Sequence, residues 1–313
     1  MPIDRRAGRL LEMLAAAGDG AGSYQNADDR RRSLDDLIRL TQGDPPALVR
    51  VGEIAIQGPR GAIPLRLYEP FATGDRPGPA LLFLHGGGWV AGGLESHDAL
   101  CRRLALACAC TLIAVGYRLA PEHPFPAALV DCQAALEWLG ENAASLGIDP
   151  HRIGVAGDSA GGTLAAAVCL AARDAGRPPL ALQLLLCPIL DVAARSASRR
   201  RLARGHFLDE QTLERDLELY CPPGVARCDP RLSPLRAGDF RGLPPALVHL
   251  AEFDPFRDEG EAYARRLADA GVKVQLTCHR GMIHFFYALA SAIPYALAAI
   301  DGVGREVRQA MSA

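Results

Sequence analysis

The stretch Gly157-Asp158-Ser159-Ala160-Gly161 is the most informative part of this 313-residue chain. A largely apolar run at 153–156 precedes it, and a run of small residues with helical character, 162–172, follows it. A strand, a sharp turn and a helix with serine at the apex form the setting in which a G-x-S-x-G motif holds a nucleophile. Because such a turn strains the serine backbone, the flanking glycines leave room for neighbouring chain. The stretch therefore predicts an exposed nucleophile, Ser159, at the end of a strand.

A second glycine-rich stretch, His85-Gly86-Gly87-Gly88-Trp89, follows the apolar run at 80–84. That run has the character of a buried parallel strand. Backbone N–H groups can approach a developing negative charge closely where no Cβ stands in the way. We therefore expect an oxyanion hole formed by the N–H groups of Gly87, Gly88 and Ala160.

The segments from residue 80 onward alternate between strand-like and helix-like patterns. This alternation predicts an α/β fold with a mostly parallel central sheet and helices on both faces. Before it, 48–56 and 62–68 predict an antiparallel pair of strands at the sheet edge. The other expected strands are 80–84, 111–115, 152–156, 181–186, 246–250 and 273–278.

Two regions interrupt this alternation. Helical patterns at 4–17 and 28–40 precede the first strand, and a polar, arginine-rich segment with one expected helix near 209–220 lies late in the chain. We expect these regions to form a small helical cap over the site. The expected division is a cap made of residues 1–45 and 191–233, and a catalytic domain made of residues 46–190 and 234–313.

A nucleophilic serine needs a base, and the base needs a partner that fixes its tautomer. Where the order along the chain is Ser, acid, His, each at the carboxyl end of a strand, Asp254 and His284 are in suitable places, after the last two expected strands. Asp258, one helical turn later, and Glu252, nearer the strand, compete for the role of the acid. His279 competes for the role of the base. The residues alone leave these alternatives open.

Five motifs occur in order: His85-Gly86-Gly87-Gly88-Trp89, Tyr117-Arg118-Leu119-Ala120-Pro121-Glu122-His123-Pro124-Phe125-Pro126, Gly157-Asp158-Ser159-Ala160-Gly161, Asp254-Pro255-Phe256-Arg257-Asp258-Glu259 and Gly281-Met282-Ile283-His284. With these motifs the chain, from about Val51 onward, resembles the bacterial hormone-sensitive-lipase-like carboxylesterases of the α/β-hydrolase fold. The resemblance implies that Asp254 is the acid and His284 the base. It also implies hydrolysis of short- to medium-chain acyl esters through an acyl-enzyme, with no metal and no organic cofactor.

One position departs from the family pattern. The family usually has a small residue after the histidine of the last motif, whereas Phe285 follows it here. Phe285 either narrows the substrate pocket or packs under the loop. Trp89, Phe207 and Asp158 are the other pocket candidates, although Trp89 fits the core equally well and Asp158 is expected to orient nearby loops.

The amino-acid composition limits the kinds of partner that the protein can be expected to bind. The net charge of −2 does not favour a nucleic acid or an acidic membrane surface as a partner. The runs Arg30-Arg31-Arg32 and Arg199-Arg200-Arg201 are expected to be solvated faces. Nine cysteines with no C-x-x-C spacing argue against a disulfide scaffold and against a zinc site.

Hydropathy bounds the location. Glu12 interrupts the only apolar run near the N-terminus, and no stretch is apolar over 18 residues. We expect a soluble, cytoplasmic protein without stable membrane insertion. Its expected partner is a small-molecule ester, and the sequence leaves open whether it forms a homodimer. Two alternative functions also stay open, namely an amidase or peptidase on the same fold and a non-catalytic small-molecule receptor. The presence of Ser159, Asp254 and His284 argues against the receptor.

Overall fold

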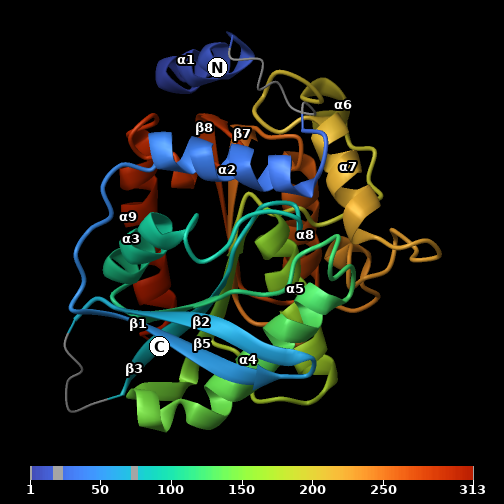
Figure 1. The fold of residues 1–313 in the computed structure, drawn as a ribbon. Helices are drawn as coiled ribbons and strands as arrows, with labels where there is room; N and C mark the ends of the chain where they lie inside the picture. The colour runs from blue at the N-terminus through green and yellow to red at the C-terminus, as the bar shows by residue number, and fades with distance from the viewer. Residues whose placement is uncertain (1, 17–23, 72–76, 313) are drawn as a thin grey trace.

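The computed structural model describes residues 2–16, 24–71 and 77–312, and the fold is shown in Figure 1. Its core is an eight-stranded sheet in the order β1-β2-β4-β3-β5-β6-β7-β8. The strands are β1 (Arg50–Gly58), β2 (Gly61–Glu69), β3 (Gly78–Leu84), β4 (Thr111–Val115), β5 (Ile148–Asp158), β6 (Leu182–Leu186), β7 (Ala246–Phe253) and β8 (Val274–Ile283). The α-helices are α1 (Arg5–Ala16), α2 (Ala27–Thr41), α3 (Asp98–Cys108), α4 (Ala127–Asn142), α5 (Ala160–Asp174), α6 (Ala197–Arg201), α7 (Glu210–Tyr220), α8 (Arg257–Asp269) and α9 (Tyr295–Ala310).

The strand directions confirm the predicted α/β architecture. β1 pairs antiparallel with β2, and β2 pairs antiparallel with β4. The pairs from β4 through β3, β5, β6 and β7 to β8 are all parallel. Because parallel strands all end at the same edge, the segments that follow β3, β5, β7 and β8 meet there.

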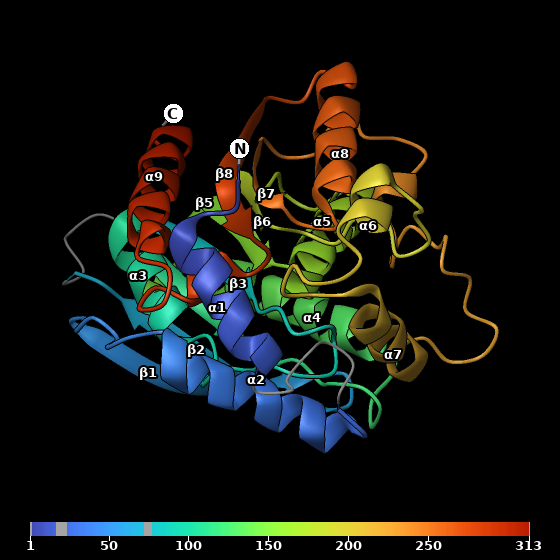
Figure 2. The same ribbon diagram turned by 90° about the horizontal axis from the view of Figure 1, so that it is seen from above.

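Each central strand is buried on both faces, which explains its continuous apolar sequence. In β3, Leu82 and Leu84 belong to the cluster packed by α4, α5 and α8, whereas Leu81 and Phe83 belong to the cluster packed by α3 and α9. Figure 2 shows these two groups of helices on opposite sides of the sheet.

The helices outside the alternation lie over the carboxyl edge of the sheet, with α1 and α2 next to α6 and α7 (Figure 1). The expected helix at 4–17 is α1, although residue 17 lies outside the described residues, as does most of the linker after it. The late segment holds two helices, α6 and α7, instead of the one expected. In the described ranges, no helix combines the length and the apolar character needed to span a membrane.

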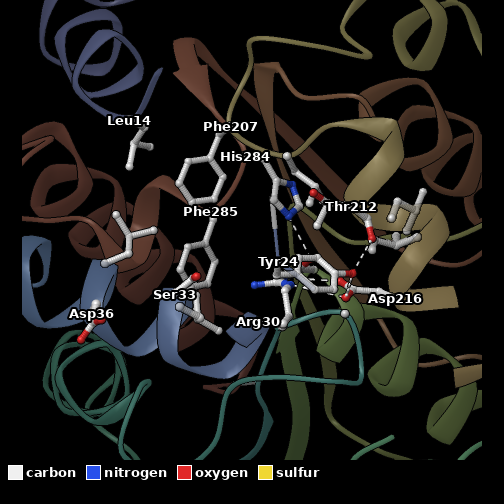
Figure 3. A pocket seen from close by; sticks show the side chains of 18 of the residues that line it. Leu14, Tyr24, Arg30, Ser33, Asp36, Phe207, Thr212, Asp216, His284 and Phe285 are labelled. Carbon is white, nitrogen blue, oxygen red and sulfur yellow. Dashed lines mark hydrogen bonds and ion pairs between the residues drawn. The ribbon is translucent and has the colours of Figure 1, made fainter. Parts of the chain in front are cut away.

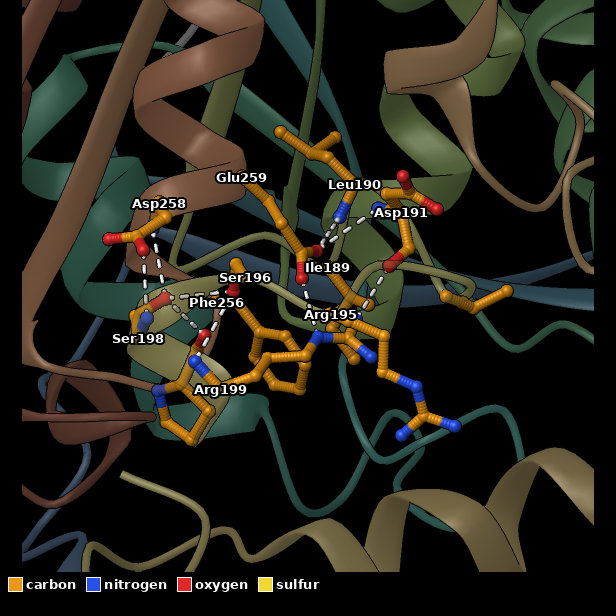
Figure 4. Close-up of polar contacts among 12 residues, drawn as sticks. Ile189, Leu190, Asp191, Arg195, Ser196, Ser198, Arg199, Phe256, Asp258 and Glu259 are labelled. Carbon is orange, nitrogen blue, oxygen red and sulfur yellow. Dashed lines mark hydrogen bonds and ion pairs between the residues drawn. The ribbon is translucent and has the colours of Figure 1, made fainter. Parts of the chain in front are cut away.

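The expectation that Arg199 lies on a solvated face is wrong. Its side chain is 8% exposed, and its Nε donates a 2.5 Å hydrogen bond to the carboxylate of Glu259, which is 1% exposed (Figure 4). The same carboxylate accepts hydrogen bonds from the backbone N–H groups of Leu190 and Asp191. Burial raises the pKa of Glu259 to about 7, against the attraction of Arg199. The pair therefore fixes α6 to the start of α8.

We expect Glu259→Gln to lower the free energy of unfolding by about 3–5 kcal/mol, because it leaves the buried guanidinium of Arg199 without a counter-charge. Urea denaturation at pH 8 measures the change. The control is Arg200→Met on the same helix, where the side chain is exposed and the change should stay within about 0.5 kcal/mol. Equal effects of the two substitutions would contradict the role given to the buried pair.

Candidate active site

Ser159 occupies the turn between β5 and α5. Its backbone has φ 52° and ψ −119°, a conformation that costs about 1–3 kcal/mol for a residue other than glycine. A Cβ at Gly161 would overlap the backbone carbonyl of Leu84 on β3, so the turn can pack against β3 only with glycine there. Ser159 is 5% exposed, in contrast to the expected exposed apex, because the helices over the sheet edge cover it.

Ser159, His284 and Asp254 form one chain of hydrogen bonds. Ser159 Oγ lies 2.8 Å from His284 Nε2, and His284 Nδ1 lies 2.8 Å from Asp254 Oδ2. Asp254 directly follows β7 and His284 directly follows β8, because both strands are longer than expected. The other carboxylate oxygen, Asp254 Oδ1, accepts the N–H of Phe256 at 2.8 Å, which fixes the carboxylate plane. With its Nδ1 proton directed at Asp254, the imidazole can accept the Ser159 proton at Nε2.

The three competing residues have other partners. Asp258 accepts the backbone N–H of Ser198 at 2.7 Å, and Glu252 accepts that of Gly281 at 2.8 Å. His279 lies between the hydroxyl groups of Tyr287 and Tyr295, at 2.7 and 3.0 Å. These contacts hold together loops and strands beside the site.

The glycine loop after β3 faces the same space. Gly87 and Gly88 have φ angles of +119° and +65°, and both line a cavity with Ser159 and His284. Asp158 Oδ1 accepts the N–H of Gly86 at 2.9 Å, which ties this loop to the serine turn. Within the described part of the chain, the N–H groups of Gly87, Gly88 and Ala160 donate no hydrogen bond to another backbone group. These three N–H groups are therefore not engaged in backbone hydrogen bonds within the described protein.

The cavity has a volume of about 260 Å³ and two chemically different walls (Figure 3). One wall is mostly apolar, although Ser33 and Asp36 also lie along it (Figure 3). Its apolar residues come from α1, α2 and the segments around α7 and His284: Leu14, Leu34, Leu37, Leu40, Phe207, Leu208, Leu213 and Phe285. The other wall is polar and is formed by Tyr24, Arg30, Thr212 and Asp216. The apolar wall suits a hydrocarbon group.

Two of the four pocket candidates line this cavity. Phe207 and Phe285 lie with their ring centroids 6.0 Å apart on its apolar wall. Phe285 is only 7% exposed, so it both lines the cavity and packs in the core, and its effect on the substrate stays a prediction. Its φ of 65° is unusual for a bulky residue.

The other two candidates lie elsewhere. Trp89 is fully buried and stacks on Tyr220 at 4.8 Å, so it belongs to the core and not to the cavity wall. Asp158 lies behind Ser159, where it borders only a hollow of about 10 Å³ and orients the glycine loop.

One group of side chains in the described ranges is close enough together to bind a metal ion: Cys187, Asp254 and His284. His284 Nδ1 is already hydrogen-bonded to Asp254, and burial raises the pKa of the Cys187 thiol. A cation would have to displace the proton of His284 Nδ1 and that of the Cys187 thiol, so we assign no metal to this group.

The residues of the polar wall were not predicted from the sequence. Arg30 was expected on a solvated face, yet it is largely buried and pairs with Asp216 at 3.4 Å. Its neighbour Arg31 also turns inward, where it donates to the carbonyl groups of Val90 and Ala120. The available signal was Asp216 itself, which shares one face of the helical pattern with Leu213 and Leu217. A charged residue on an apolar helix face indicates a buried polar contact.

The chain is similar to known proteins over nearly its whole length. A protein-family model described as alpha/beta hydrolase fold matches residues 81–288. The ethyl acetate hydrolase of Pseudomonas putida is 41% identical over 296 residues, which cover 92% of this chain and 89% of that protein. The carboxylesterase NlhH of Mycobacterium tuberculosis is 43% identical over 247 residues, covering 78% of this chain and 76% of that protein.

Solved structures agree with these sequence relatives. An ester-hydrolase from the metagenome of Lake Arreo, in complex with a bipyridine phosphonate derivative, superposes with a TM-score of 0.94. It is 40% identical, and the match covers 99% of this chain and 100% of that one. An esterase of Pyrobaculum calidifontis has a TM-score of 0.90 at 33% identity, with 98% and 99% of the chains covered.

The histidine of the glycine loop generates a prediction about acid sensitivity. Burial lowers the pKa of His85 to about 3, and its ring stacks on Tyr117 at 4.1 Å. Between about pH 6.5 and 3 the unfolded chain binds a proton that the native chain does not, so stability is lost as the pH falls. From pH 6.5 to 5 the loss from this residue is about 2 kcal/mol.

We therefore expect His85→Asn to reduce the drop in unfolding free energy between pH 7 and pH 5 by about 2 kcal/mol. Urea denaturation of both proteins at the two pH values measures it. Between pH 7.5 and 9 the unfolding free energies of the two proteins should change with pH by the same amount. Equal drops on acidification would show that His85 is protonated in the native state.

Proposed function

This chain is a carboxylic-ester hydrolase of the α/β-hydrolase fold family, and we propose that Ser159, His284 and Asp254 carry out its reaction. The observation that carries the proposal is the continuous hydrogen-bond chain from Ser159 Oγ through the imidazole to Asp254. Ser159 and His284 line a cavity that is also lined by Gly87 and Gly88. Nucleophile, base and orienting acid are then in the positions that acyl transfer requires.

The reaction proceeds in two halves. Ser159 Oγ attacks the ester carbonyl carbon while its proton passes to His284 Nε2, and Asp254 stabilises the resulting imidazolium. The N–H groups of Gly87, Gly88 and Ala160 bind the oxyanion. When the carbonyl re-forms, the bond to the alcohol oxygen breaks, and the alcohol leaves with the proton from His284.

The second half regenerates the enzyme. Water attacks the acyl-enzyme while His284 takes one of its protons, and a second oxyanion forms at the same N–H groups. Its collapse breaks the bond to Ser159 Oγ, which recovers the proton from His284, and the carboxylic acid departs. As proposed, the two halves use the ester, one water molecule and the groups of the protein named above.

The cavity supports short- to medium-chain acyl esters as substrates. Its volume of about 260 Å³ and its wall of leucine and phenylalanine side chains fit a hydrocarbon group of limited length. Among the relatives, the ethyl acetate hydrolase is named for an ester with a short acyl group.

We assign residues 1–45 and 191–233 to a cap and residues 46–190 and 234–313 to the catalytic domain. Support comes from the cavity, which the described parts of both cap segments share with Ser159 and His284. Residues 1 and 17–23 of the first segment lie outside the described residues. Four statements stay predictions from the sequence: the small-ester substrate, the cytoplasmic location, the absence of nucleic-acid binding and the possibility of a homodimer.

An amidase or peptidase would use the same three side chains. A pair of chromogenic substrates with one acyl group, a 4-nitrophenyl ester and the matching 4-nitroanilide, separates the two. We expect kcat/KM for the ester to exceed that for the anilide by at least about a thousandfold, and a smaller ratio would favour the amidase.

Replacing the nucleophile gives the most direct test. Ser159→Ala should lower kcat on 4-nitrophenyl butyrate by about four to six orders of magnitude, since the acyl-enzyme can no longer form. The control is Ser145→Ala, an exposed serine far from the cavity. Both variants should unfold within about 1 kcal/mol of the wild type. Turnover of Ser159→Ala above about 1% of wild type would exclude Ser159 as the nucleophile.

Substitution of Phe285 tests both the pocket and the backbone. Phe285→Gly should raise the octanoate-to-acetate ratio of kcat/KM about tenfold, because it removes part of the apolar wall. Phe285→Ala should raise the ratio similarly. Its free energy of unfolding should be about 1 kcal/mol lower than that of Phe285→Gly, since alanine keeps the cost of a positive φ and glycine does not. An unchanged ratio together with a stability loss of about 3–5 kcal/mol in both variants would make Phe285 a core residue only.

A further inference from the structure

Helix α7 rests directly on the glycine loop that faces Ser159. A Cβ at Gly88 would overlap the carboxylate of Asp216, so the Asp216 side chain of α7 packs directly against the loop where Gly88 has no side chain of its own. One turn further along α7, Tyr220 stacks on Trp89 with nearly parallel rings, 4.8 Å and 1° apart. The two contacts join successive residues of the loop to successive turns of the helix.

The contact places a buried acid beside the loop. Asp216 is 1% exposed, and burial raises the pKa of its carboxyl group. Tyr24 donates a 2.9 Å hydrogen bond to Asp216 Oδ1. Arg30 Nε lies 3.4 Å from the same oxygen, and Arg30 Nη2 lies 3.4 Å from Oδ2 (Figure 3). Arg215 binds the other side of Tyr24, where its Nη1 donates to the Tyr24 carbonyl at 2.6 Å.

The charge of this acid matters for the chemistry. The N–H of Gly88 is one of the donors assigned to the oxyanion, and a negative charge on Asp216, which lies beside the loop on the wall of the same cavity, opposes the negative charge that forms on the oxyanion. In a site shielded from water this repulsion is strong. The guanidinium of Arg30 is the group that balances it, since Tyr24 contributes a hydrogen bond but no charge.

We propose that Arg30 and Asp216 are positioning residues for the oxyanion hole: Asp216 supports the loop at Gly88, and Arg30 neutralises it so that the loop can bind negative charge. The proposal rests on the ester hydrolysis proposed above. Helix α2 from the N-terminal segment and α7 from the insertion then act on the rate of acyl transfer as well as enclosing the substrate.

The test compares Arg30→Gln, Asp216→Asn and the double variant on 4-nitrophenyl butyrate. Arg30→Gln should lower kcat about 10- to 100-fold with KM changed less than about threefold, because the loss falls on the transition state. Adding Asp216→Asn should recover at least about tenfold of that loss, since the unbalanced charge is gone. Arg30→Lys, which keeps the charge, should stay within about threefold of the wild type. Arg32→Met is the matched control, because it removes the same charge from an exposed position of α2 and should leave kcat unchanged.

A second readout isolates the oxyanion. A trifluoromethyl ketone forms a charged adduct with a nucleophilic serine, whereas the parent methyl ketone binds without charge. Arg30→Gln should weaken inhibition by the fluorinated compound by the same factor as kcat and leave inhibition by the methyl ketone unchanged. If Arg30 served only to stabilise the fold, Arg30→Gln would change neither kcat nor the relative inhibition by the two ketones.

Three results would overturn the inference: wild-type kcat in Arg30→Gln, absence of rescue by Asp216→Asn, or equal weakening of both ketones. If Arg30→Gln does not fold, the double variant is compared with Arg30→Lys, and a kcat more than about tenfold lower in the double variant overturns it. Failure of the proposed function looks different, since it appears as turnover by Ser159→Ala.

Discussion

Two backbones meet without side chains between them where Gly161 packs against the carbonyl of Leu84, and the site depends on this contact. It brings the start of α5 against the end of β3, so the serine turn and the glycine loop become neighbours. The strained φ of Ser159 then lifts its hydroxyl toward His284. The strain persists because the parallel sheet on either side leaves the turn no alternative.

The sheet order supplies the other partners. β5, β6, β7 and β8 lie side by side and parallel, so residues that follow β7 and β8 reach the serine turn from one direction. Asp254 and His284 each come directly after the last residue of their strand, where the backbone is still held by neighbouring strands. Rigid strand ends keep the two 2.8 Å contacts without help from a flexible loop.

The predictable parts of the structure were those set by local pattern. Parallel strands buried on both faces appear as continuous apolar runs, and the motifs place Ser159, Asp254 and His284 at strand ends. Arg30 and Arg199 were misjudged because an arginine run looks the same whether it faces water or a buried carboxylate. Their partners, Asp216 and Glu259, lie far away in the chain, and only the folded topology brings them together. Trp89 stayed ambiguous for the same reason, since its stacking partner Tyr220 is in the insertion.

The contact between Tyr24 and Asp216 spans 192 positions of the chain, and Asp4 bonds to Gly281 still further on. During synthesis at about 5–20 residues per second, the first helices wait about 10–40 s before α7 exists, and longer for β8. The hydrogen bonds that Tyr24 and Asp4 make to these later segments cannot form until then. The N-terminal helices therefore complete their contacts with α7 and β8 late, and the cavity that they help to line is complete only after β8 has been made.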